Sequence, residues 1–354
     1  AEARVTKIID DSPFVAKSKC SHYWICSKLQ SLSYEQQLKE KEKQVEDAFQ
    51  RLGGFSDFKL DDIKGAKQIY NYRNKMEFTF SPHRWILESE PEGVDSSFAL
   101  GLHIPGRYDK ILDVDECHIQ PELGNKILSI AKDVCLNNRE LKPYDPKTNV
   151  GFLRYLMLRF GVKTDQLMVN IVTAYEDLDR LVPFVSQLTS EFSEITTVVN
   201  NINTRKADVS FGEKEILLYG QPVLKEKLKN LTFQISSNSF FQTNTHMAEK
   251  LYDVILDEVD SSSNEIAYDL YCGAGSISLF LAQKVKFVYA FDIIVSSIEN
   301  AEENALYNNV ENVDFKVANL DTYFDNHRLS GRPKPDIVVV DPPRSGMHKK
   351  MTSF

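Results

Sequence analysis

The sequence predicts an α/β protein in which the C-terminal third, residues 236–354, folds around a parallel β-sheet. Two observations support this prediction: short apolar strands alternate with helical segments after residue 245, and a turn containing Gly273 and Gly275 joins the first strand to the next helix. Alternating strands and helices of these lengths form right-handed βαβ units, in which the strands run parallel. Residues 18–235 are richer in strands and predict a separate α+β domain.

The composition sets broad limits on function. A chain of 354 residues has room for two or three domains, and its 42% hydrophobic and 26% charged residues are the balance of an ordinary globular protein. The net charge of −9 means that any nucleic acid must bind a local basic face, because the chain as a whole is acidic. No apolar run reaches the roughly 18 residues of a membrane span, so we expect no membrane partner.

The cysteines indicate a reducing compartment. There are five, an odd number scattered along the chain, which argues against a secreted disulfide framework. We therefore expect an intracellular protein and leave cytoplasm, nucleus and organelle open. The chain begins without Met and ends at Phe354 without a terminating element, so we also expect it to be an excerpt of a longer protein.

The individual elements follow from periodicity and turn residues. Residues 1–17 alternate and then reach an Asp-Asp-Ser-Pro turn, which predicts a strand and its exit turn. Residues 34–52 predict a helix, because Leu38, Val45 and Phe49 fall on one face and two glycines follow. In the central region we expect strands at 76–80, 98–104, 155–162, 166–174 and 196–202, with helices at 121–136 and 177–192. In the C-terminal third we expect helices at 245–259, 277–284 and 295–308, with strands at 265–271, 287–293, 313–318 and 335–341.

A cofactor site is predicted where the first C-terminal strand ends. Gly273 and Gly275 permit a tight turn and close approach of a ligand, and Asp292 ends the next strand, where a carboxylate can accept hydrogen bonds from ribose hydroxyls. The turn lacks the third glycine of a dinucleotide fingerprint, and no phosphate-binding Gly-Lys-Ser/Thr follows. A cofactor with an adenosine and no phosphates fits best, which favours S-adenosylmethionine over NAD or ATP. A tight turn without a ligand is the structural alternative.

The segment after the strand at 335–341 adds a second loop to this site. Asp341, Pro342, Pro343 and Arg344 follow the apolar run directly, and ligands of such sheets bind outside the carboxyl ends of the strands. The two prolines stiffen the loop and fix how Asp341 presents its carboxylate. The alternative is a strand that simply ends there. Enzymes that methylate amines of nucleic acids usually place an aromatic residue after the two prolines, so Arg344 indicates different chemistry.

The motifs together resemble those of the RNA uridine C5-methyltransferase family, whose members form 5-methyluridine in tRNA or rRNA. The resemblance rests on FFQTN at 240–244, YCGAGSISL at 271–279 and VVDPPRSGM at 339–347, with similar segments at 71–80 and 113–119, and it covers nearly the whole chain. It implies a Rossmann-like class I methyltransferase domain at 236–354, a central α+β RNA-binding domain at 18–235, and the end of an OB-like TRAM domain at 1–17.

The family's cofactor contacts carry over to positions of this sequence. The resemblance assigns contacts with S-adenosylmethionine to Gln242, Tyr271, Gly273, Ser276, Asp292 and Asp341. Ser276 stands where many members have Asn, and Asp292 stands where they usually have Glu; a shorter carboxylate can still hold ribose hydroxyls. The structural alternatives are a core tyrosine at 271, a helix cap at Gln242 and an ordinary first helical residue at Ser276.

The resemblance also implies covalent catalysis. Carbon 5 of uracil is a poor nucleophile, so a cysteine thiolate first adds to carbon 6 and carbon 5 then attacks the methyl group. A base removes the carbon 5 proton, and the cysteine leaves. In the family the cysteine and a glutamate base follow the Asp-Pro-Pro-Arg segment, and neither is present before Phe354. Cys272 belongs to the cofactor turn and Cys135 to a predicted helix, so we expect no catalytic residue within this chain and no activity of this chain alone.

Many family members hold a [4Fe–4S] cluster with four cysteines. Cys20, Cys26 and Cys117 match three of the four positions, while Leu29 occupies the remaining one. Such clusters usually need four thiolates, so a degenerate cluster site competes with a vestigial loop that carries free thiols. A zinc site that uses the two neighbouring histidines is a further alternative.

The family's substrate implies RNA as the partner, with tRNA favoured over rRNA and the protein expected to act as a monomer. Basic residues mixed with aromatic ones supply candidates for phosphate contact, namely Arg73, Lys75, Arg154 and Arg159. Solvated strand flanks would show the same pattern. Two other functions stay open: a non-catalytic RNA-binding or tRNA-folding protein that retains the fold, and an adenine or cytosine amine methyltransferase, against which Arg344 counts.

Overall fold

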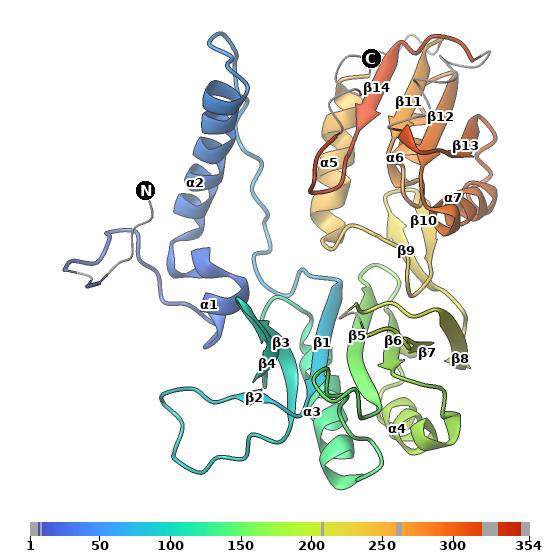
Figure 1. Cartoon of the computed structure of the whole chain (residues 1–354). Helices are drawn as coiled ribbons and strands as arrows, with labels where there is room; N and C mark the ends of the chain where they lie inside the picture. Colours follow the sequence, from blue (N-terminus) through green and yellow to red (C-terminus); the bar gives the residue numbers. More distant parts are fainter. Residues whose placement is uncertain (1–5, 8, 207–208, 260–263, 321–331, 348–354) are drawn as a thin grey trace.

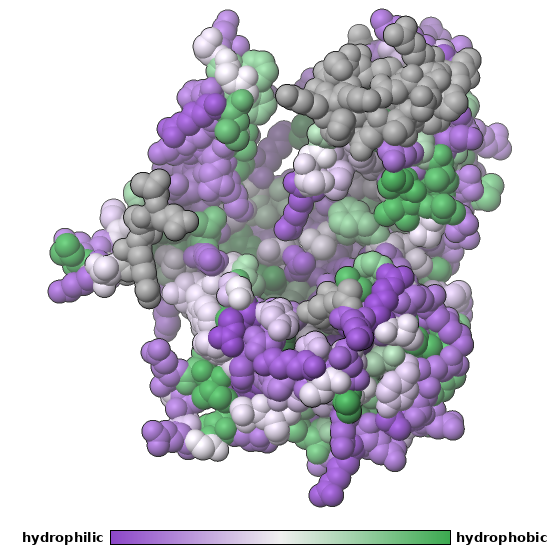
Figure 2. Space-filling model, viewed as in Figure 1, coloured by the Kyte–Doolittle hydropathy of each residue, from purple (hydrophilic) through white to green (hydrophobic). Residues whose placement is uncertain are grey.

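The computed structural model describes residues 6–7, 9–206, 209–259, 264–320 and 332–347. The chain forms an N-terminal arm, a central sheet with helices packed against it, and a C-terminal α/β domain (Figure 1). The arm and the C-terminal domain rise on the same side of the central sheet, and the surface is hollowed between them (Figure 2). Among the described residues, no helix is long and apolar enough to cross a lipid bilayer.

The N-terminal arm is built from short helical turns and one longer helix. It contains α1 (Tyr23–Cys26), the 3-10 helix η1 (Lys28–Ser31), α2 (Tyr34–Asp47) and the π-helical turn η2 (Ala48–Leu52). The helix expected at 34–52 is confirmed, and the Ser33 hydroxyl caps it by accepting a hydrogen bond from the Gln36 amide at 3.4 Å. Val45 and Phe49, on the apolar face of this helix, remain 47% and 44% exposed.

The first residues do not form the expected strand. In 9–17 the Val15 amide donates to the Ser12 carbonyl at 3.0 Å, and Val15 makes an isolated β-bridge with Leu32. The strand prediction is therefore wrong for residues 6–7 and 9, while residues 1–5 and 8 lie outside the described part. A strand needs a neighbour to satisfy its amides and carbonyls, and the described part of this segment meets none beyond that single bridge.

The central sheet has eight strands among the described residues, in the order β2-β4-β3-β1-β5-β6-β7-β8. They are β1 (Lys75–Ser81), β2 (Arg84–Trp85), β3 (Ala99–Ile104), β4 (Arg107–Asp113), β5 (Leu153–Gly161), β6 (Gln166–Thr173), β7 (Ile195–Ile202) and β8 (Lys214–Gly220). Neighbours are antiparallel except for β2–β4 and β6–β7. The five strands expected in this region are confirmed, and β2, β4 and β8 add to them.

Two helices pack against the central sheet (Figure 1). They are α3 (Glu122–Asn137) and α4 (Leu178–Glu191), which confirm the helices expected in this region. Phe78 and Phe80, two residues apart on one face of β1, are at most 1% exposed and belong to one cluster with Ile127 of α3 and Phe184 of α4. Burying a side chain of this size contributes about 1.5–3 kcal/mol, so this apolar layer stabilises the sheet.

The C-terminal domain contains a parallel sheet in the order β13-β12-β11-β14. Its elements are α5 (Thr245–Asp257), β11 (Ile266–Leu270), α6 (Ser276–Leu281), β12 (Phe287–Asp292), α7 (Val295–Tyr307), β13 (Val313–Val317) and β14 (Ile337–Val340). All seven elements expected here are confirmed. The chain steps from β11 outward to β13 and then returns to the other side of β11, and ligand crevices form outside the carboxyl ends of the strands at such a reversal.

A hairpin connects the central sheet to this domain. It consists of β9 (Leu224–Leu228) and β10 (Leu231–Ile235), and its buried side chains share one apolar cluster with α5, α6 and α7. The Phe233 ring of the hairpin lies 5.7 Å from the Phe241 ring, centroid to centroid. The hairpin thus packs with the C-terminal core although it precedes residue 236, and the domain boundary at 236 stays a prediction.

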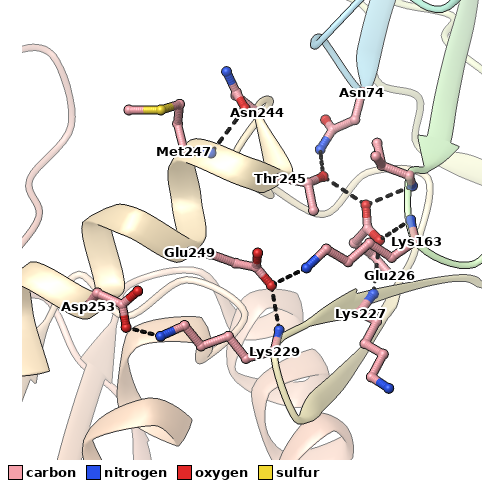
Figure 3. Close-up of polar contacts among 11 residues, drawn as sticks. Asn74, Lys163, Glu226, Lys227, Lys229, Asn244, Thr245, Met247, Glu249 and Asp253 are labelled. Atoms are coloured by element: carbon pink, nitrogen blue, oxygen red, sulfur yellow. Dashed lines mark hydrogen bonds and ion pairs between the residues drawn. The ribbon is translucent and has the colours of Figure 1, made fainter. Parts of the chain in front are cut away.

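A buried carboxylate joins the central sheet to the C-terminal domain (Figure 3). Glu226 of β9 is fully buried, and its two oxygens accept hydrogen bonds from the amides of Val162 (2.9 Å) and Lys163 (3.0 Å), which follow β5. The Thr245 hydroxyl of α5 donates to the same carboxylate at 2.8 Å and accepts from the Asn74 amide group at 3.0 Å. We call this chain of contacts, from Asn74 through Thr245 and Glu226 to residues 162–163, the joint.

We expect Glu226→Ala to lower the free energy of unfolding by about 2–3 kcal/mol, because buried donors would lose their only charged acceptor. Glu226→Gln keeps the shape of the side chain and should lower it by less. The exposed Glu299 offers a matched control, and Glu299→Ala should change stability by no more than about 0.5 kcal/mol. Urea denaturation followed by circular dichroism measures all three; equal stability of Glu226→Ala and Glu299→Ala would show that the joint is not structural.

Candidate active site

The glycine-rich turn lies at the carboxyl end of β11. Its backbone enters the left-handed region three times, with φ of 69° at Tyr271, 54° at Gly273 and 80° at Gly275. A Cβ at Gly275 would also meet the Phe315 ring and Ala301 Cβ at about 3.0 Å, so only glycine fits there. A tyrosine with positive φ is uncommon and marks a backbone held by its surroundings. The turn leads directly into α6.

Asp292 holds this turn from the next strand. One of its carboxylate oxygens accepts a hydrogen bond from the Gly273 amide at 2.9 Å, and the other accepts from the Ile294 amide at 2.9 Å. The carboxylate is therefore fixed in orientation while each oxygen keeps a further lone pair for a ligand. The structure thus brings Gly273 and Asp292 together, as the sequence predicts for a ribose-binding pair.

Asp341 reaches the same edge of the sheet from β14. Its amide donates to the Leu270 carbonyl at 3.4 Å, which places the start of the proline loop beside the end of β11. Its side chain is exposed. Burial raises the pKa of Asp269, and the nearby charge of Asp341 raises it further.

Ser276, the first residue of α6, is bonded to a tyrosine that sequence reasoning missed. The Tyr252 hydroxyl donates to Ser276 Oγ at 2.9 Å, and Tyr252 is 1% exposed. Burial raises the pKa of Tyr252 to about 12, so the phenol remains a donor at neutral pH. Ser276 therefore keeps its own hydroxyl proton for another acceptor. Periodicity marks Tyr252 only as a core residue of α5.

Asp269 is a second residue that sequence reasoning did not single out. It lies inside β11, is fully buried, and accepts a hydrogen bond from the Ser278 hydroxyl at 2.5 Å. Its other oxygen has no hydrogen-bond partner among the described residues. Burial raises the pKa of Asp269 to about 7. The available signal was a carboxylate in an otherwise apolar strand next to the glycine turn.

Gln242 belongs to a loop whose carbonyl groups accept hydrogen bonds from residues of the central domain. Asn74 donates from its amide group to the Gln242 carbonyl at 2.9 Å and from its backbone to the Thr243 carbonyl at 2.8 Å. Arg159 donates to the Ser239 carbonyl at 2.7 Å. The cap of α5 is Asn244, whose side chain accepts from the Met247 amide at 3.1 Å, so the alternative of Gln242 as the helix cap is wrong.

A cleft of about 820 Å³ adjoins this loop, and of the predicted residues Gln242, Arg73, Lys75, Cys26 and Cys117 line it, whereas Tyr271, Gly273, Ser276, Asp292 and Asp341 do not. Gln242 and Phe240 line it from the C-terminal domain, together with residues 342–344 of the proline loop. Arg73 and Lys75 line it from the central domain. Phe240 is 67% exposed, so a large aromatic face is presented to solvent beside these residues. The cleft also contains Glu77, one of whose carboxylate oxygens lies 3.4 Å from Lys75 Nζ. Its polar, cationic and aromatic side chains are of the kinds that contact a splayed-out RNA base and its phosphates.

The four predicted RNA contacts fall into two groups. Arg73 and Lys75 line the cleft, and burial lowers the pKa of Lys75. Arg154 and Arg159 are 3% and 4% exposed. Arg154 donates to the Asn203 carbonyl at 2.8 Å and stacks on Tyr144, while burial lowers the pKa of Arg159 to about 10. The burial of this second pair argues for structural roles and against phosphate contact.

Tyr271 packs with Tyr268, Leu270 and Phe291 in a small apolar cluster and is only half-buried. This packing supports the alternative in which Tyr271 is a core residue. The side chain is nevertheless partly accessible. A contact with the cofactor remains a prediction for Tyr271.

The three cysteines of the suggested cluster lie in one region but do not make a metal site. Cys20 and Cys117 both raise the pKa of Cys26, which reaches about 11, after the larger effect of burial. Cys20 is held by Gln30, whose side-chain oxygen accepts from the Cys20 amide at 2.8 Å. Among the described residues, no group of three or more His, Cys, Asp or Glu side chains is arranged to hold a metal ion. With Leu29 at the third of the four cysteine positions, the residues present do not fit a [4Fe–4S] cluster.

The fold and site define a class I methyltransferase architecture: a parallel sheet with a glycine-rich turn, a carboxylate at the end of the next strand and a loop at the chain reversal. Known proteins agree. The family described as tRNA (uracil-5-)-methyltransferase matches residues 186–354. An uncharacterized RNA methyltransferase of Chlorobaculum tepidum is 39% identical over 360 residues, which cover 99% of this chain and 74% of the relative.

Two further comparisons extend the likeness. An uncharacterized RNA methyltransferase of Porphyromonas gingivalis is 35% identical over 99% of this chain and 77% of its own length. The crystal structure of Pyrococcus abyssi tRNA (uracil-54, C5)-methyltransferase in complex with S-adenosyl-L-homocysteine matches with a TM-score of 0.73 and 28% identity, over 98% of this chain and 74% of that one. The chain belongs to the RNA (uracil-5-)-methyltransferase family.

The raised pKa of Asp269 predicts a pH dependence of stability. Between about pH 4 and pH 7 the folded protein keeps a proton on Asp269 that the unfolded chain releases, so the free energy of unfolding falls as the pH rises through this window. We expect Asp269→Asn, which cannot ionise, to reduce this fall. Urea unfolding at about pH 5 and about pH 8 measures it. The exposed Asp257 provides the control Asp257→Asn, and an unchanged pH profile of Asp269→Asn would contradict the assignment.

Proposed function

We propose that this protein transfers the methyl group of S-adenosylmethionine to carbon 5 of a uridine in RNA. The observation that carries the proposal is the cleft in which Gln242, the proline loop at 342–344 and the cationic residues Arg73 and Lys75 face one another at the carboxyl edge of the parallel sheet. Membership of the RNA (uracil-5-)-methyltransferase family supports the reaction, and the Pyrococcus abyssi enzyme of similar structure holds S-adenosyl-L-homocysteine.

The residues at this edge fit a cofactor that carries positive charge and no phosphates. Asp269, Asp292 and Asp341 converge there, since the latter two raise the pKa of Asp269. A sulfonium and an ammonium group would relieve this repulsion, whereas a polyphosphate would increase it. When bound, S-adenosylmethionine supplies an electrophilic methyl group. In this proposal Asp292 binds the ribose hydroxyls, Gly273 lets the backbone approach, and Gln242, Tyr271, Ser276 and Asp341 surround the remainder.

The covalent step requires a reactive cysteine, and the described cysteines fit this role poorly. Burial raises the pKa of Cys272 and of Cys135 far above the usual thiol range, and it raises the pKa of Cys117 as well. Cys26 lines the cleft, but its pKa of about 11 leaves it protonated at neutral pH. We therefore retain the assignment that the resemblance gives, in which the nucleophilic cysteine and the glutamate base come after the proline loop.

We favour tRNA over rRNA as the substrate, with a monomeric enzyme. The matching family is described by its action on tRNA, and so is the Pyrococcus abyssi enzyme. The substrate uridine must leave its stack to reach carbon 5, and the exposed Phe240 and the cations Arg73 and Lys75 provide stacking and phosphate contacts at the mouth of the cleft.

The proposed activity predicts a specific loss of modification in cells. Deleting the gene should remove 5-methyluridine from tRNA, as measured by mass spectrometry of nuclease digests of tRNA and rRNA kept separate. Loss from rRNA alone would keep the enzyme and reject tRNA as its substrate. Unchanged 5-methyluridine in both would overturn the proposal and favour a non-catalytic RNA-binding protein.

The assigned positions of the catalytic residues predict that the 354-residue chain binds S-adenosylhomocysteine but transfers no methyl group from labelled S-adenosylmethionine to a tRNA transcript. A transcript containing 5-fluorouridine should form no covalent adduct with it, because adduct formation needs the thiolate. Turnover by this chain would show that a described residue supplies the nucleophile, and Cys26→Ser would then be the first variant to examine.

The role of Asp292 predicts that Asp292→Asn weakens binding of S-adenosylhomocysteine by about 10–100-fold, since hydrogen bonds to a charged acceptor are worth about 1.5–3 kcal/mol. Isothermal titration calorimetry measures the affinity. Because Asp292 also braces the Gly273 turn, thermal unfolding of the variant must be compared in parallel. Glu299→Ala on α7 is the control, and an affinity of Asp292→Asn equal to this control would remove Asp292 from the site.

A further inference from the structure

A second cavity, of about 490 Å³, lies between the N-terminal arm and the start of α5. Residues of η1 and α2, residues 63–72 and the first turn of α5 line it. Cys26 and Ile119 line both this cavity and the cleft of the candidate active site, so the two hollows are neighbours. Its volume is within the range of about 300–1,000 Å³ that is usual for ligand sites.

The charge of this cavity differs from the charge of the chain. Lys28, Lys41 and Lys64 line it, and none of its described lining residues is Asp or Glu, although the whole chain carries a net charge of −9. A neighbouring depression, which Lys64 and Lys250 also line, contains four acids, Asp61, Asp62, Asp257 and Glu258. The two hollows thus differ in their acids: the cavity that adjoins the active-site cleft has lysines without carboxylates among its described lining residues, which favours an anionic ligand.

The same cavity presents three tyrosines. Tyr34, Tyr70 and Tyr72 line it, and all three are half-buried. The Tyr34 hydroxyl accepts a hydrogen bond from the Ala66 amide at 2.7 Å, which fixes its orientation. Lys19 lies 5.0 Å from the centre of the Tyr70 ring, so a further cation is close to this aromatic face. Tyrosines beside lysines are the combination by which proteins bind the bases and phosphates of single-stranded nucleic acid.

The walls of the cavity are tied to both parts of the molecule. Tyr34 holds residue 66 to α2, while Lys250 of α5 donates to the Gly65 carbonyl at 2.9 Å. The segment at 63–72 is therefore anchored between the arm and the C-terminal domain. A ligand in this cavity would contact the arm and lie at a fixed distance from the cleft.

We propose that this cavity binds a nucleotide of the RNA strand next to the uridine in the active-site cleft. Tyr70 and Tyr72 stack on its base, and Lys28, Lys41 and Lys64 contact the phosphates on either side. The proposal rests on RNA being the substrate and adds the path of the strand: from the cleft, past Cys26 and Ile119, into the space beneath α2. The arm thereby becomes part of the RNA-binding surface.

The test compares the RNA affinities of the wild-type protein and three variants by fluorescence anisotropy with an unmodified tRNA transcript. Lys41→Gln/Lys64→Gln alters the cavity, and Lys39→Gln/Lys43→Gln alters two exposed lysines of the same helix that do not line it. We expect the cavity variant to bind at least about 10-fold more weakly than the control and to show a smaller salt dependence. Tyr70→Leu should weaken binding about 5–100-fold, as the loss of one stacked base would.

Each outcome decides the proposal. Binding of S-adenosylhomocysteine should stay unchanged in all variants, which separates a loss of RNA contact from a loss of fold. A 4-thiouridine placed beside the target uridine should crosslink to the peptide that contains residues 63–72. Equal affinities of the cavity and control variants, or a crosslink elsewhere, would overturn the inference. The proposed function would stand in that case, provided that the wild-type protein binds RNA. Absence of RNA binding by the wild-type protein would overturn both.

Discussion

The buried carboxylate of Glu226 is the contact on which the geometry of this protein depends. A fully buried carboxylate is stable only when its oxygens are satisfied, and here its donors come from the turn after β5, from β9 and from α5. These segments belong to both halves of the molecule. Because Thr245 also accepts a hydrogen bond from Asn74, any movement of one domain against the other breaks several bonds at once.

The joint fixes the loop that carries Gln242. Asn74 and Arg159, from the central domain, donate hydrogen bonds to three carbonyls of this loop, at residues 239, 242 and 243. The loop is therefore positioned by one domain and belongs to the core of the other. As a consequence, Gln242 and Phe240 face Arg73 and Lys75 across a cleft whose width is set by hydrogen bonds to backbone atoms. In the proposed function the C-terminal domain binds the cofactor and the central domain contacts the RNA, and the joint would then fix the position of one against the other.

Three carboxyl groups lie close together at the carboxyl edge of the parallel sheet, where they repel one another. Asp269 is buried, and among the described residues one of its oxygens has no hydrogen-bond partner; burial raises its pKa, and the nearby Asp341 and Asp292 raise it further. Asp292 accepts hydrogen bonds from two backbone amides, whereas Asp269 accepts one from a hydroxyl group. The two carboxyl groups thus differ: the Asp292 side chain is held in one orientation by backbone amides, whereas burial raises the pKa of Asp269 to about 7.

Local pattern alone determined much of this protein. Apolar periodicity and turn residues predicted every helix and strand of the C-terminal sheet, and the pairing of Gly273 with Asp292 follows because parallel strands end at one edge. The strand expected from periodicity is absent at residues 6–7 and 9, because a strand is stabilised by the neighbour with which it pairs. Only the tertiary structure decided which basic residues are accessible. Arg154 and Arg159 have the same sequence appearance as Arg73 and Lys75, but they are buried against carbonyl groups brought from distant segments, and no local pattern contains that information.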